Sequence, residues 1–208
     1  MFVTLEGVEG CGKTSQAHTL AHNLRNRGVA VALTREPGGS PIGAAMRSLL
    51  LSEHYAVNPR TELLLYAAER AEHVESVIRP ALTRGELVLC DRFGDATRAY
   101  QAWGRGLPRE DVEALHAFAT GGLEPDLTLY LRLPVAKAVE RARLRDGAAP
   151  SGEGRFEAEA LDFHSRVAEG YESLAREFPE RIVPVDASGP REAVTGRLWA
   201  ILEARLGL

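Results

Sequence analysis

The glycine-rich segment near the start of this chain limits its possible folds more than any other part of the sequence. It reads Gly7-Val8-Glu9-Gly10-Cys11-Gly12-Lys13-Thr14 and matches the phosphate-binding pattern G-x-x-x-x-G-K-[ST]. Glycines let backbone N–H groups turn toward an anion, and the dipole of a following helix adds positive charge there. We expect Lys13 to reach the β- and γ-phosphates of a nucleotide and the Thr14 hydroxyl to hold Mg²⁺. A glycine turn that binds nothing is the alternative.

The residues on either side favour phosphate binding. Residues 2–6 form a short apolar run that is typical of a buried strand, and residues 15–27 carry apolar side chains at helical spacing, among them Leu20 and Leu24. A strand, a glycine turn and a helix N-terminus, in this order, are the context that a phosphate-binding loop requires.

Strand-like and helix-like segments alternate along the rest of the chain. Further strands are expected at 29–34, 86–90, 127–131 and 181–185, and further helices at 42–51, 59–84, 95–103, 109–120, 135–145, 156–178 and 191–206. Pro80 is expected to bend the last turn of the helix at 59–84. Apolar strands separated by helices predict an α/β fold, in which helices cover both faces of a five-stranded parallel sheet.

Composition narrows the class of protein further. The chain has 208 residues, of which 45% are hydrophobic, and a formal net charge of −4, which suits a single domain at residues 1–208. Net negative charge argues against nucleic-acid and polybasic membrane partners, and no apolar run has membrane-spanning length. The two cysteines do not make a disulfide scaffold, so we expect a cytoplasmic protein.

Charged residues follow the predicted strands, where side chains of a parallel sheet gather at one edge. Arg35 follows the second strand and can clamp a phosphate, unless it is simply an exposed arginine in a turn. Asp91 and Arg92 follow the third strand. We expect Asp91 to orient Mg²⁺ and Arg92 to hold a second phosphate; an ion pair that caps the strand is the alternative.

Two further features point to a second substrate. Glu9 would repel a phosphate, so it needs another role, such as a hydrogen bond to a sugar hydroxyl; a solvated loop acid is the alternative. Residues 147–154 are rich in glycine and end at Arg155, which predicts a mobile lid at approximately 146–156 that excludes water, unless the segment is only a surface loop. Two facing anionic substrates indicate phosphoryl transfer between nucleotides.

Taken together, these motifs resemble the bacterial-type thymidylate kinases, a family of P-loop nucleoside monophosphate kinases. The matching runs are T-R-E-P-G-G at 34–39, L-Y-A-A-E-R at 65–70, D-R-F at 91–93, A-Y-Q at 99–101, G-R-G at 104–106 and D-A-S at 186–188. The resemblance covers essentially the whole chain. It implies a three-layer P-loop NTPase fold and the Mg²⁺-assisted, ATP-dependent phosphorylation of dTMP to dTDP in dTTP biosynthesis. It also implies a homodimer, with the helix from Pro59 as a candidate interface.

The resemblance further implies a role for each matching residue. ATP would bind on Gly7, Val8, Glu9, Gly10, Cys11, Gly12, Lys13, Thr14 and Ser188; dTMP on Glu9, Arg35, Tyr66, Arg70, Arg92, Thr97, Tyr100 and Gln101. Catalytic roles would fall to Lys13, Arg35, Asp91, Arg92 and the lid residue Arg155, and Mg²⁺ to Thr14 and, through water, Asp91. Glu9 would accept from the 3′-hydroxyl and Arg70 would bind thymine O4.

Three positions depart from the family pattern. Tyr66 stands where phenylalanine usually stacks on thymine, Ala96 replaces a serine, and Arg98 is bulky and charged for its place. These changes bear on base affinity and selectivity and not on the phosphoryl machinery. Two alternatives are a kinase for another nucleoside monophosphate and a nucleotide-dependent switch without transfer activity; intact Lys13, Asp91 and Arg155 argue against the switch.

Overall fold

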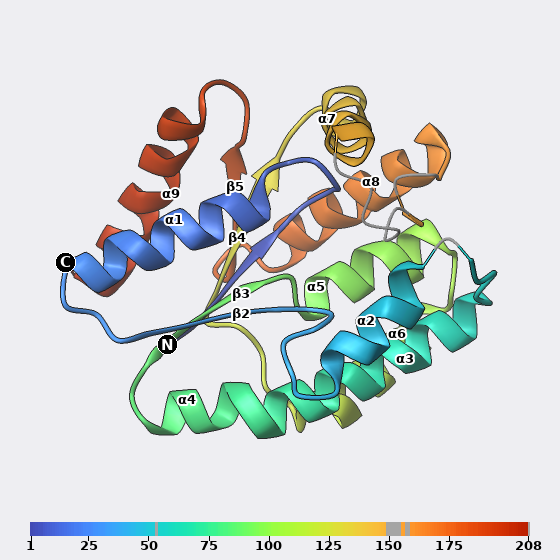
Figure 1. Ribbon diagram of the computed structural model, residues 1–208, viewed down its shortest axis with the longest axis horizontal. Helices are drawn as coiled ribbons and strands as arrows, with labels where there is room; N and C mark the ends of the chain where they lie inside the picture. Colours follow the sequence, from blue (N-terminus) through green and yellow to red (C-terminus); the bar gives the residue numbers. More distant parts are fainter. Residues whose placement is uncertain (53, 149–154, 157–158, 208) are drawn as a thin grey trace.

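The computed structural model describes residues 1–52, 54–148, 155–156 and 159–207, and a parallel sheet lies at its centre (Figure 1). The strands are β1 (Phe2–Glu6), β2 (Val31–Arg35), β3 (Leu87–Asp91), β4 (Leu127–Arg132) and β5 (Ile182–Asp186). Their order is β2-β3-β1-β4-β5, with every neighbouring pair parallel. The five-stranded parallel sheet predicted from the sequence is therefore confirmed.

Helices cover both faces of the sheet. They are α1 (Lys13–Asn26), α2 (Gly43–Leu51), α3 (Pro59–His73), α4 (Arg79–Thr83), α5 (Gly94–Thr97), α6 (Arg109–Thr120), α7 (Val135–Ala148), α8 (Leu161–Glu177) and α9 (Arg191–Leu206), with π-helical segments η1 (Val74–Ile78) and η2 (Arg98–Gly104). Helices α1 and α9 pack together on one face, whereas α4 and α8 contact strands from the other (Figure 1). None of the helices in the described part of the chain is both long and apolar enough for a membrane span.

Three predicted helices differ from the observed ones. The helix expected at 59–84 contains the π segment η1 just before Pro80; a wider turn moves away the carbonyl that the proline ring would otherwise meet. The helix expected at 95–103 begins at Gly94 and becomes π-helical from Arg98. The helix expected at 156–178 begins at Leu161, because Phe156 is buried against Tyr100 instead.

The lid prediction at 146–156 falls largely outside the described residues. Within it, residues 146–148 end α7, and Arg155 and Phe156 form part of a turn.

Strand register brings the functional strand ends together. Every residue of β1 and β3 is buried, as expected for central strands of a covered sheet. Arg35 of β2 lies opposite Asp91 of β3, which lies opposite Leu5 of β1. The chain then continues across this edge, where Arg92 N donates to Leu5 O at 3.0 Å. The carboxyl ends of three strands therefore form one platform.

Candidate active site

The phosphate-binding loop connects β1 to α1 and depends on its glycines. Gly7, Gly10 and Gly12 have φ values of 141°, 77° and 100°, a region that side-chain-bearing residues avoid. A Cβ on Gly10 would also lie 2.0 Å from the Ala138 carbonyl oxygen. Lys13 folds back over this loop, because its buried Nζ donates to Gly7 O at 3.1 Å and Val8 O at 2.9 Å. The ammonium is thus held where the loop amides converge, as an anion requires.

A pair of oxygen ligands lies beside the loop. Thr14 Oγ1 donates to Asp91 Oδ2 at 2.5 Å, joining the start of α1 to the end of β3. Hydroxyl and carboxylate oxygens are the donors that Mg²⁺ prefers, so these two residues fit a magnesium ion held with a nucleotide phosphate.

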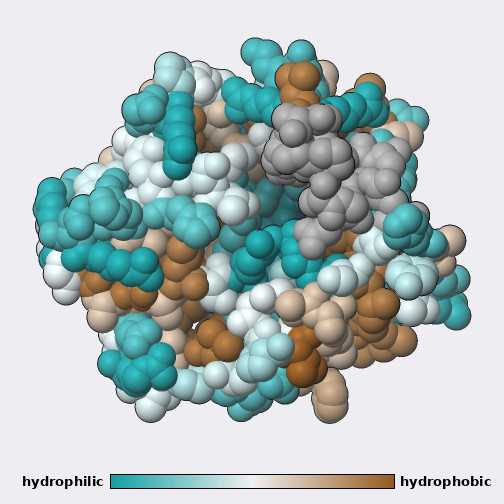
Figure 2. Space-filling model, in the orientation of Figure 1, coloured by the Kyte–Doolittle hydropathy of each residue, from teal (hydrophilic) through white to brown (hydrophobic). Residues whose placement is uncertain are grey.

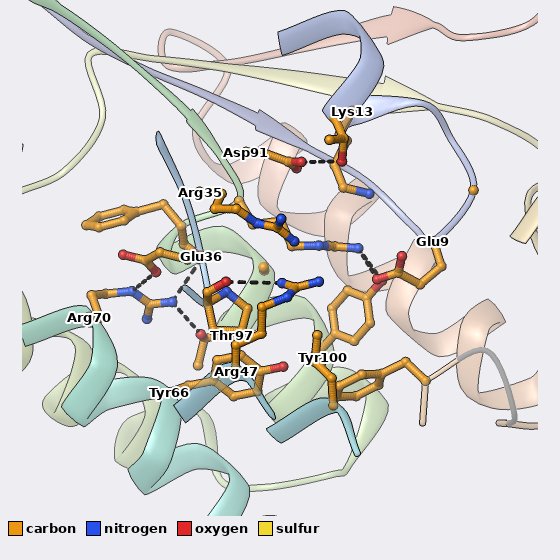
Figure 3. Close-up of a pocket in the computed structure, with 18 of the residues that line it drawn as sticks. Glu9, Lys13, Arg35, Glu36, Arg47, Tyr66, Arg70, Asp91, Thr97 and Tyr100 are labelled. Atoms are coloured by element: carbon orange, nitrogen blue, oxygen red, sulfur yellow. Dashed lines mark hydrogen bonds and ion pairs between the residues drawn. The ribbon is translucent and has the colours of Figure 1, made fainter. Parts of the chain in front are cut away.

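A cavity of about 630 Å³ runs from this loop across the strand ends. It is lined by most of the predicted residues: Glu9, Gly10, Gly12, Lys13, Thr14, Arg35, Tyr66, Arg70, Asp91, Arg92, Thr97, Tyr100 and Gln101. Lys13 and Asp91 lie at one end and Tyr66, Arg70 and Thr97 at the other (Figure 3). Figure 2 shows hydrophilic residues in the hollow on this face. The cavity has room for more than one small polar ligand.

Five predicted residues do not line this cavity. Gly7 and Val8 contribute the carbonyls that hold Lys13, and Cys11 is buried beneath the loop. Ser188 lies just beyond β5 in a turn, where its N–H donates to Asp186 Oδ1 at 2.9 Å. The fifth, Arg155, lies against Glu62: its Nη2 is 2.8 Å from Glu62 Oε2, and its Nε donates to Leu50 O at 2.6 Å.

Arg92 lines the cavity beside the phosphate-binding loop. It has a φ of 73°, which is uncommon for any residue other than glycine. Its guanidinium pairs with Glu9 and donates to Gly7 O at 3.0 Å and Tyr100 OH at 3.1 Å. Since Asp91 binds Thr14 while Arg92 pairs with Glu9, the two adjacent residues do not form the strand-capping pair that was the alternative.

Arg70 closes the far end of the cavity and is 2% exposed. Its Nε donates to Glu36 Oε2 at 2.8 Å, and its Nη2 donates to Thr97 Oγ1 at 2.9 Å and Phe93 O at 3.1 Å. Three partners therefore fix the guanidinium plane, which suits recognition of a carbonyl oxygen on a flat base.

Glu36, which the sequence analysis did not single out, lies at the centre of a buried network. Its other oxygen is 2.8 Å from His73 Nδ1, and His73 Nε2 is 2.7 Å from Thr34 Oγ1. Burial alone would raise the pKa of Glu36, but Arg70 and His73 outweigh it and lower that pKa. Ligand atoms of Glu36, Glu69 and His73 come within 4.8 Å of one another. Because Arg70 and His73 already occupy both Glu36 oxygens, we interpret this cluster as a hydrogen-bonded support for Arg70.

Two other cations line the cavity. Arg47 reaches it from α2 and donates to Pro37 O at 3.1 Å, and Arg141 reaches it from α7. Arg141 lies in the helix just before the predicted lid, and neither residue was assigned a role from the sequence. The only signal for Arg47 is its place in the helix that follows the T-R-E-P-G-G turn, which does not show the face it occupies.

Arg98 does not line the cavity and lies instead in a second, partly buried cluster of charges. It is 6% exposed and pairs with Asp95 at 3.0 Å, with Glu113 at 2.9 Å and with Glu124 at 2.6 Å. Its bulk and charge are therefore accommodated behind the site.

Replacing Arg98 by methionine is expected to destabilise the fold and leave substrate affinity unchanged. Asp95 keeps Arg181 as a partner, but the charge-assisted hydrogen bonds from Arg98 to Asp95, Glu113 and Glu124 are lost. The free energy of unfolding should therefore fall by about 2 kcal/mol, measured by urea denaturation. Arg84→Met, at an exposed pair with Glu86, is the matched control and should change stability little. Equal effects of the two substitutions would contradict this reading.

The sheet, the phosphate-binding loop and the charged cavity at the strand ends define a nucleotide-binding phosphotransferase of the P-loop type. The sequence model of the family described as thymidylate kinase matches residues 5–197. The chain belongs to the thymidylate kinase family.

Individual thymidylate kinases are similar to this chain over nearly their whole lengths. The chain is 50% identical over 208 residues to the thymidylate kinase of Synechococcus sp. (strain JA-2-3B'a(2-13)), covering 100% of this chain and 97% of the relative. It is 52% identical to the enzyme of Desulfovibrio desulfuricans, covering 99% and 96%. The crystal structure of thymidylate kinase from Ehrlichia chaffeensis superimposes with a TM-score of 0.78 at 30% identity, over 97% of this chain and 98% of that one.

Proposed function

We propose that this chain transfers the γ-phosphoryl group of ATP to dTMP, with Mg²⁺, and releases ADP and dTDP. The observation that carries the proposal is that a single cavity is lined both by the loop residues Lys13 and Thr14 and by Arg70 at its far end. Arg92 lines the same cavity and donates to Gly7 O of the loop. A cavity with a single anion site would suit a nucleotide-dependent switch. A cavity that also contains a second cation and an end large enough for a base suits a kinase that binds a second nucleotide as phosphate acceptor.

The ATP side of the reaction uses the loop and Asp91. Lys13 exchanges its carbonyl partners for phosphate oxygens, and the amides of the loop bind the same phosphates. When Mg²⁺ is bound, it neutralises charge on the phosphates. Thr14 and Asp91 hold it, the latter through water. Ser188 borders the adenine.

The acceptor side uses the cations between the two ends of the cavity. Arg35 and Arg92 hold the 5′-phosphate of dTMP, which places it in line with the γ-phosphate. Glu9, already beside Arg92, accepts from the 3′-hydroxyl. Tyr100 lies against the deoxyribose and leaves no room for a 2′-hydroxyl.

The base end sets the choice of acceptor. Arg70 binds thymine O4, Thr97 and Gln101 address the base edge, and Tyr66 stacks on the ring. Gln101 is itself fixed, because its Nε2 donates to the buried Glu62 Oε1 at 2.7 Å.

The role proposed for Arg155 requires a rearrangement. It acts on the transferring phosphoryl group only after leaving Glu62 and Leu50 O, its present partners. Arg141, which already lines the cavity, is a second cation available from the same region.

Coupled measurement of ADP release with a panel of monophosphate acceptors tests the proposal. We expect rapid release with dTMP, slower release with dUMP, because the thymine methyl is worth only about 1–3 kcal/mol, and little with purine monophosphates. Faster ADP release with another monophosphate would favour a kinase for that nucleotide. ATP hydrolysis at a rate that no acceptor changes would favour a nucleotide-dependent switch.

Replacing Tyr66 by phenylalanine is expected to change the KM for dTMP by less than about twofold. No residue in the described ranges is seen to bond its hydroxyl, so the ring alone is expected to contribute stacking. Steady-state kinetics with varied dTMP measures this, and a large rise in KM would show a hydroxyl contact with the base.

We further propose that residues 1–208 form one catalytic domain that works as a homodimer in the cytoplasm, where ATP is present and Cys11 and Cys90 stay reduced. The support for a dimer is apolar exposure on two helices that pack together: Leu64 of α3 is 55% exposed and Phe118 of α6 is 87% exposed. Sedimentation of Leu64→Glu and Phe118→Glu variants should show monomers. If both variants were dimers, the interface would not include these two residues.

A further inference from the structure

Beneath the cavity, outside its lining, lies a buried carboxylate that the proposed reaction does not use. Glu6 is the last residue of β1 and is 0% exposed. Its Oε1 accepts from the backbone N–H of Phe93 at 2.7 Å and of Ala96 at 3.3 Å. Its Oε2 accepts from the Tyr171 hydroxyl at 2.8 Å. A carboxylate without solvent contact is costly to keep in a protein core, so the presence of Glu6 at this position needs an explanation.

The backbone donors lie directly after Arg92. Because Arg92 has a left-handed φ of 73°, the turn from β3 into α5 is held in a conformation that its residue disfavours. Glu6 binds the next N–H along the chain, that of Phe93, and an N–H of the first turn of α5. The carboxylate thereby fixes the direction in which the Arg92 side chain leaves the backbone.

The hydroxyl donor connects Glu6 to the guanidinium itself. Tyr171 projects from α8, is 1% exposed, and stacks on Tyr130 with ring centroids 5.1 Å apart. While its hydroxyl donates to Glu6, its oxygen accepts from Arg92 Nη1 at 3.3 Å. Glu6 therefore contacts both ends of Arg92: the backbone turn directly and the side chain through one hydroxyl.

We propose that Glu6 is a positioning residue for phosphoryl transfer, which as a carboxylate holds Arg92 in the geometry that receives the acceptor phosphate. This inference rests on the proposed function, because it assigns Arg92 to the phosphate of dTMP. This positioning requires a side chain that accepts a hydrogen bond from each of its three donors. Protonated glutamic acid and glutamine each bring a donor to a place where Phe93, Ala96 and Tyr171 already donate.

Protonation of Glu6 falls in an accessible range. Burial raises the pKa of Glu6 to about 7, with the nearby Asp95 of α5 acting in the same direction and Arg92, the Phe93 N–H and Tyr171 opposing them. Glu6 is thus ionised above this pH and becomes neutral as the pH falls through it. Positioning of Arg92 should be complete near pH 8 and weaken toward pH 6.

The test is steady-state kinetics of Glu6→Gln at pH 8 and pH 6. At pH 8 we expect the KM for dTMP to rise by about 10- to 100-fold, as for a displaced binding group, with the KM for ATP nearly unchanged. A variant that only folds less well would lose kcat and keep both KM values. At pH 6 the ratio of variant to wild-type KM should shrink, since the wild-type carboxylate is then largely neutral.

Two further variants keep the test decisive. Tyr171→Phe removes the hydroxyl that joins Glu6 to the guanidinium and leaves both backbone donors of Glu6 in place. It should raise the KM for dTMP by a smaller factor, even if Glu6→Gln fails to fold. Thr4→Val is the matched control: Thr4 is buried on the same strand and bonds Thr128 Oγ1 at 2.8 Å, so both KM values should stay unchanged.

The outcomes separate the two proposals. A wild-type protein without dTMP-dependent ADP release overturns the proposed function. A wild-type protein that transfers, together with Glu6→Gln or Tyr171→Phe proteins whose KM for dTMP equals that of the wild type at pH 8, overturns only the role of Glu6.

Discussion

Arg92→Ala is expected to lower kcat/KM for dTMP by about 10³-fold, which corresponds to about 4 kcal/mol. Arg92 lines the cavity and donates to Gly7 O, Tyr100 OH and Glu9. Without it, the Glu9 carboxylate beside the acceptor phosphate loses its Arg92 counter-ion, so repulsion adds to the lost attraction. Steady-state kinetics with dTMP varied at saturating ATP measures the change, and the KM for ATP should move little.

The matched control for Arg92→Ala is Arg132→Ala. Arg132 also ends a strand, β4, but pairs with Glu172 on an exposed surface, where an ion pair contributes little. We expect kinetics close to those of the wild type. If Arg92→Ala showed unchanged acceptor kinetics, the assignment of a second phosphate to this arginine would be wrong.

Lys13→Met is expected to reduce kcat by at least about 10³-fold, because the ammonium stabilises charge on the transferring phosphoryl group. Methionine fills the space of the lysine stem without its charge, so the loop should keep its fold. Rapid-quench measurement of a single turnover separates transfer from product release, and titration with labelled ATP reports weakened binding.

The chain offers a close control for this substitution. Its other lysine, Lys137, is exposed on α7, so Lys137→Met removes the same charge away from the loop. We expect its single-turnover rate to match that of the wild type. A rate for Lys13→Met within tenfold of the wild type would argue against phosphoryl transfer at this loop.

Much of the fold follows from local sequence. Strands of a covered parallel sheet are apolar throughout, so each of the five was located within one or two residues. The arrangement of the site followed as well, because parallel strands end at one edge. Arg35 and Asp91, expected just after their strands, are their final residues, opposite each other in register.

The missed features depend on contacts between distant segments. Glu36 meets Arg70 34 positions further along the chain, and sequence spacing does not show such a pair. The role of Arg155 on the phosphoryl group stays a prediction, but its partner in this structure, Glu62, is set by how α3 packs and does not follow from sequence spacing. The π segments η1 and η2 also need tertiary context, since their sequences carry the same apolar spacing as α-helices.

The central claim is that the two nucleotides face each other across the strand ends, with Lys13 and Arg92 drawing their phosphates together. Calorimetric titration with a bisubstrate analogue, adenosine and thymidine joined by a polyphosphate bridge, tests this most directly. We expect one molecule per chain, bound at least about 100-fold more tightly than ATP or dTMP alone, and weakened by both Lys13→Met and Arg92→Ala. An affinity no higher than that of the tighter single nucleotide would contradict the account, because the two sites would then not adjoin.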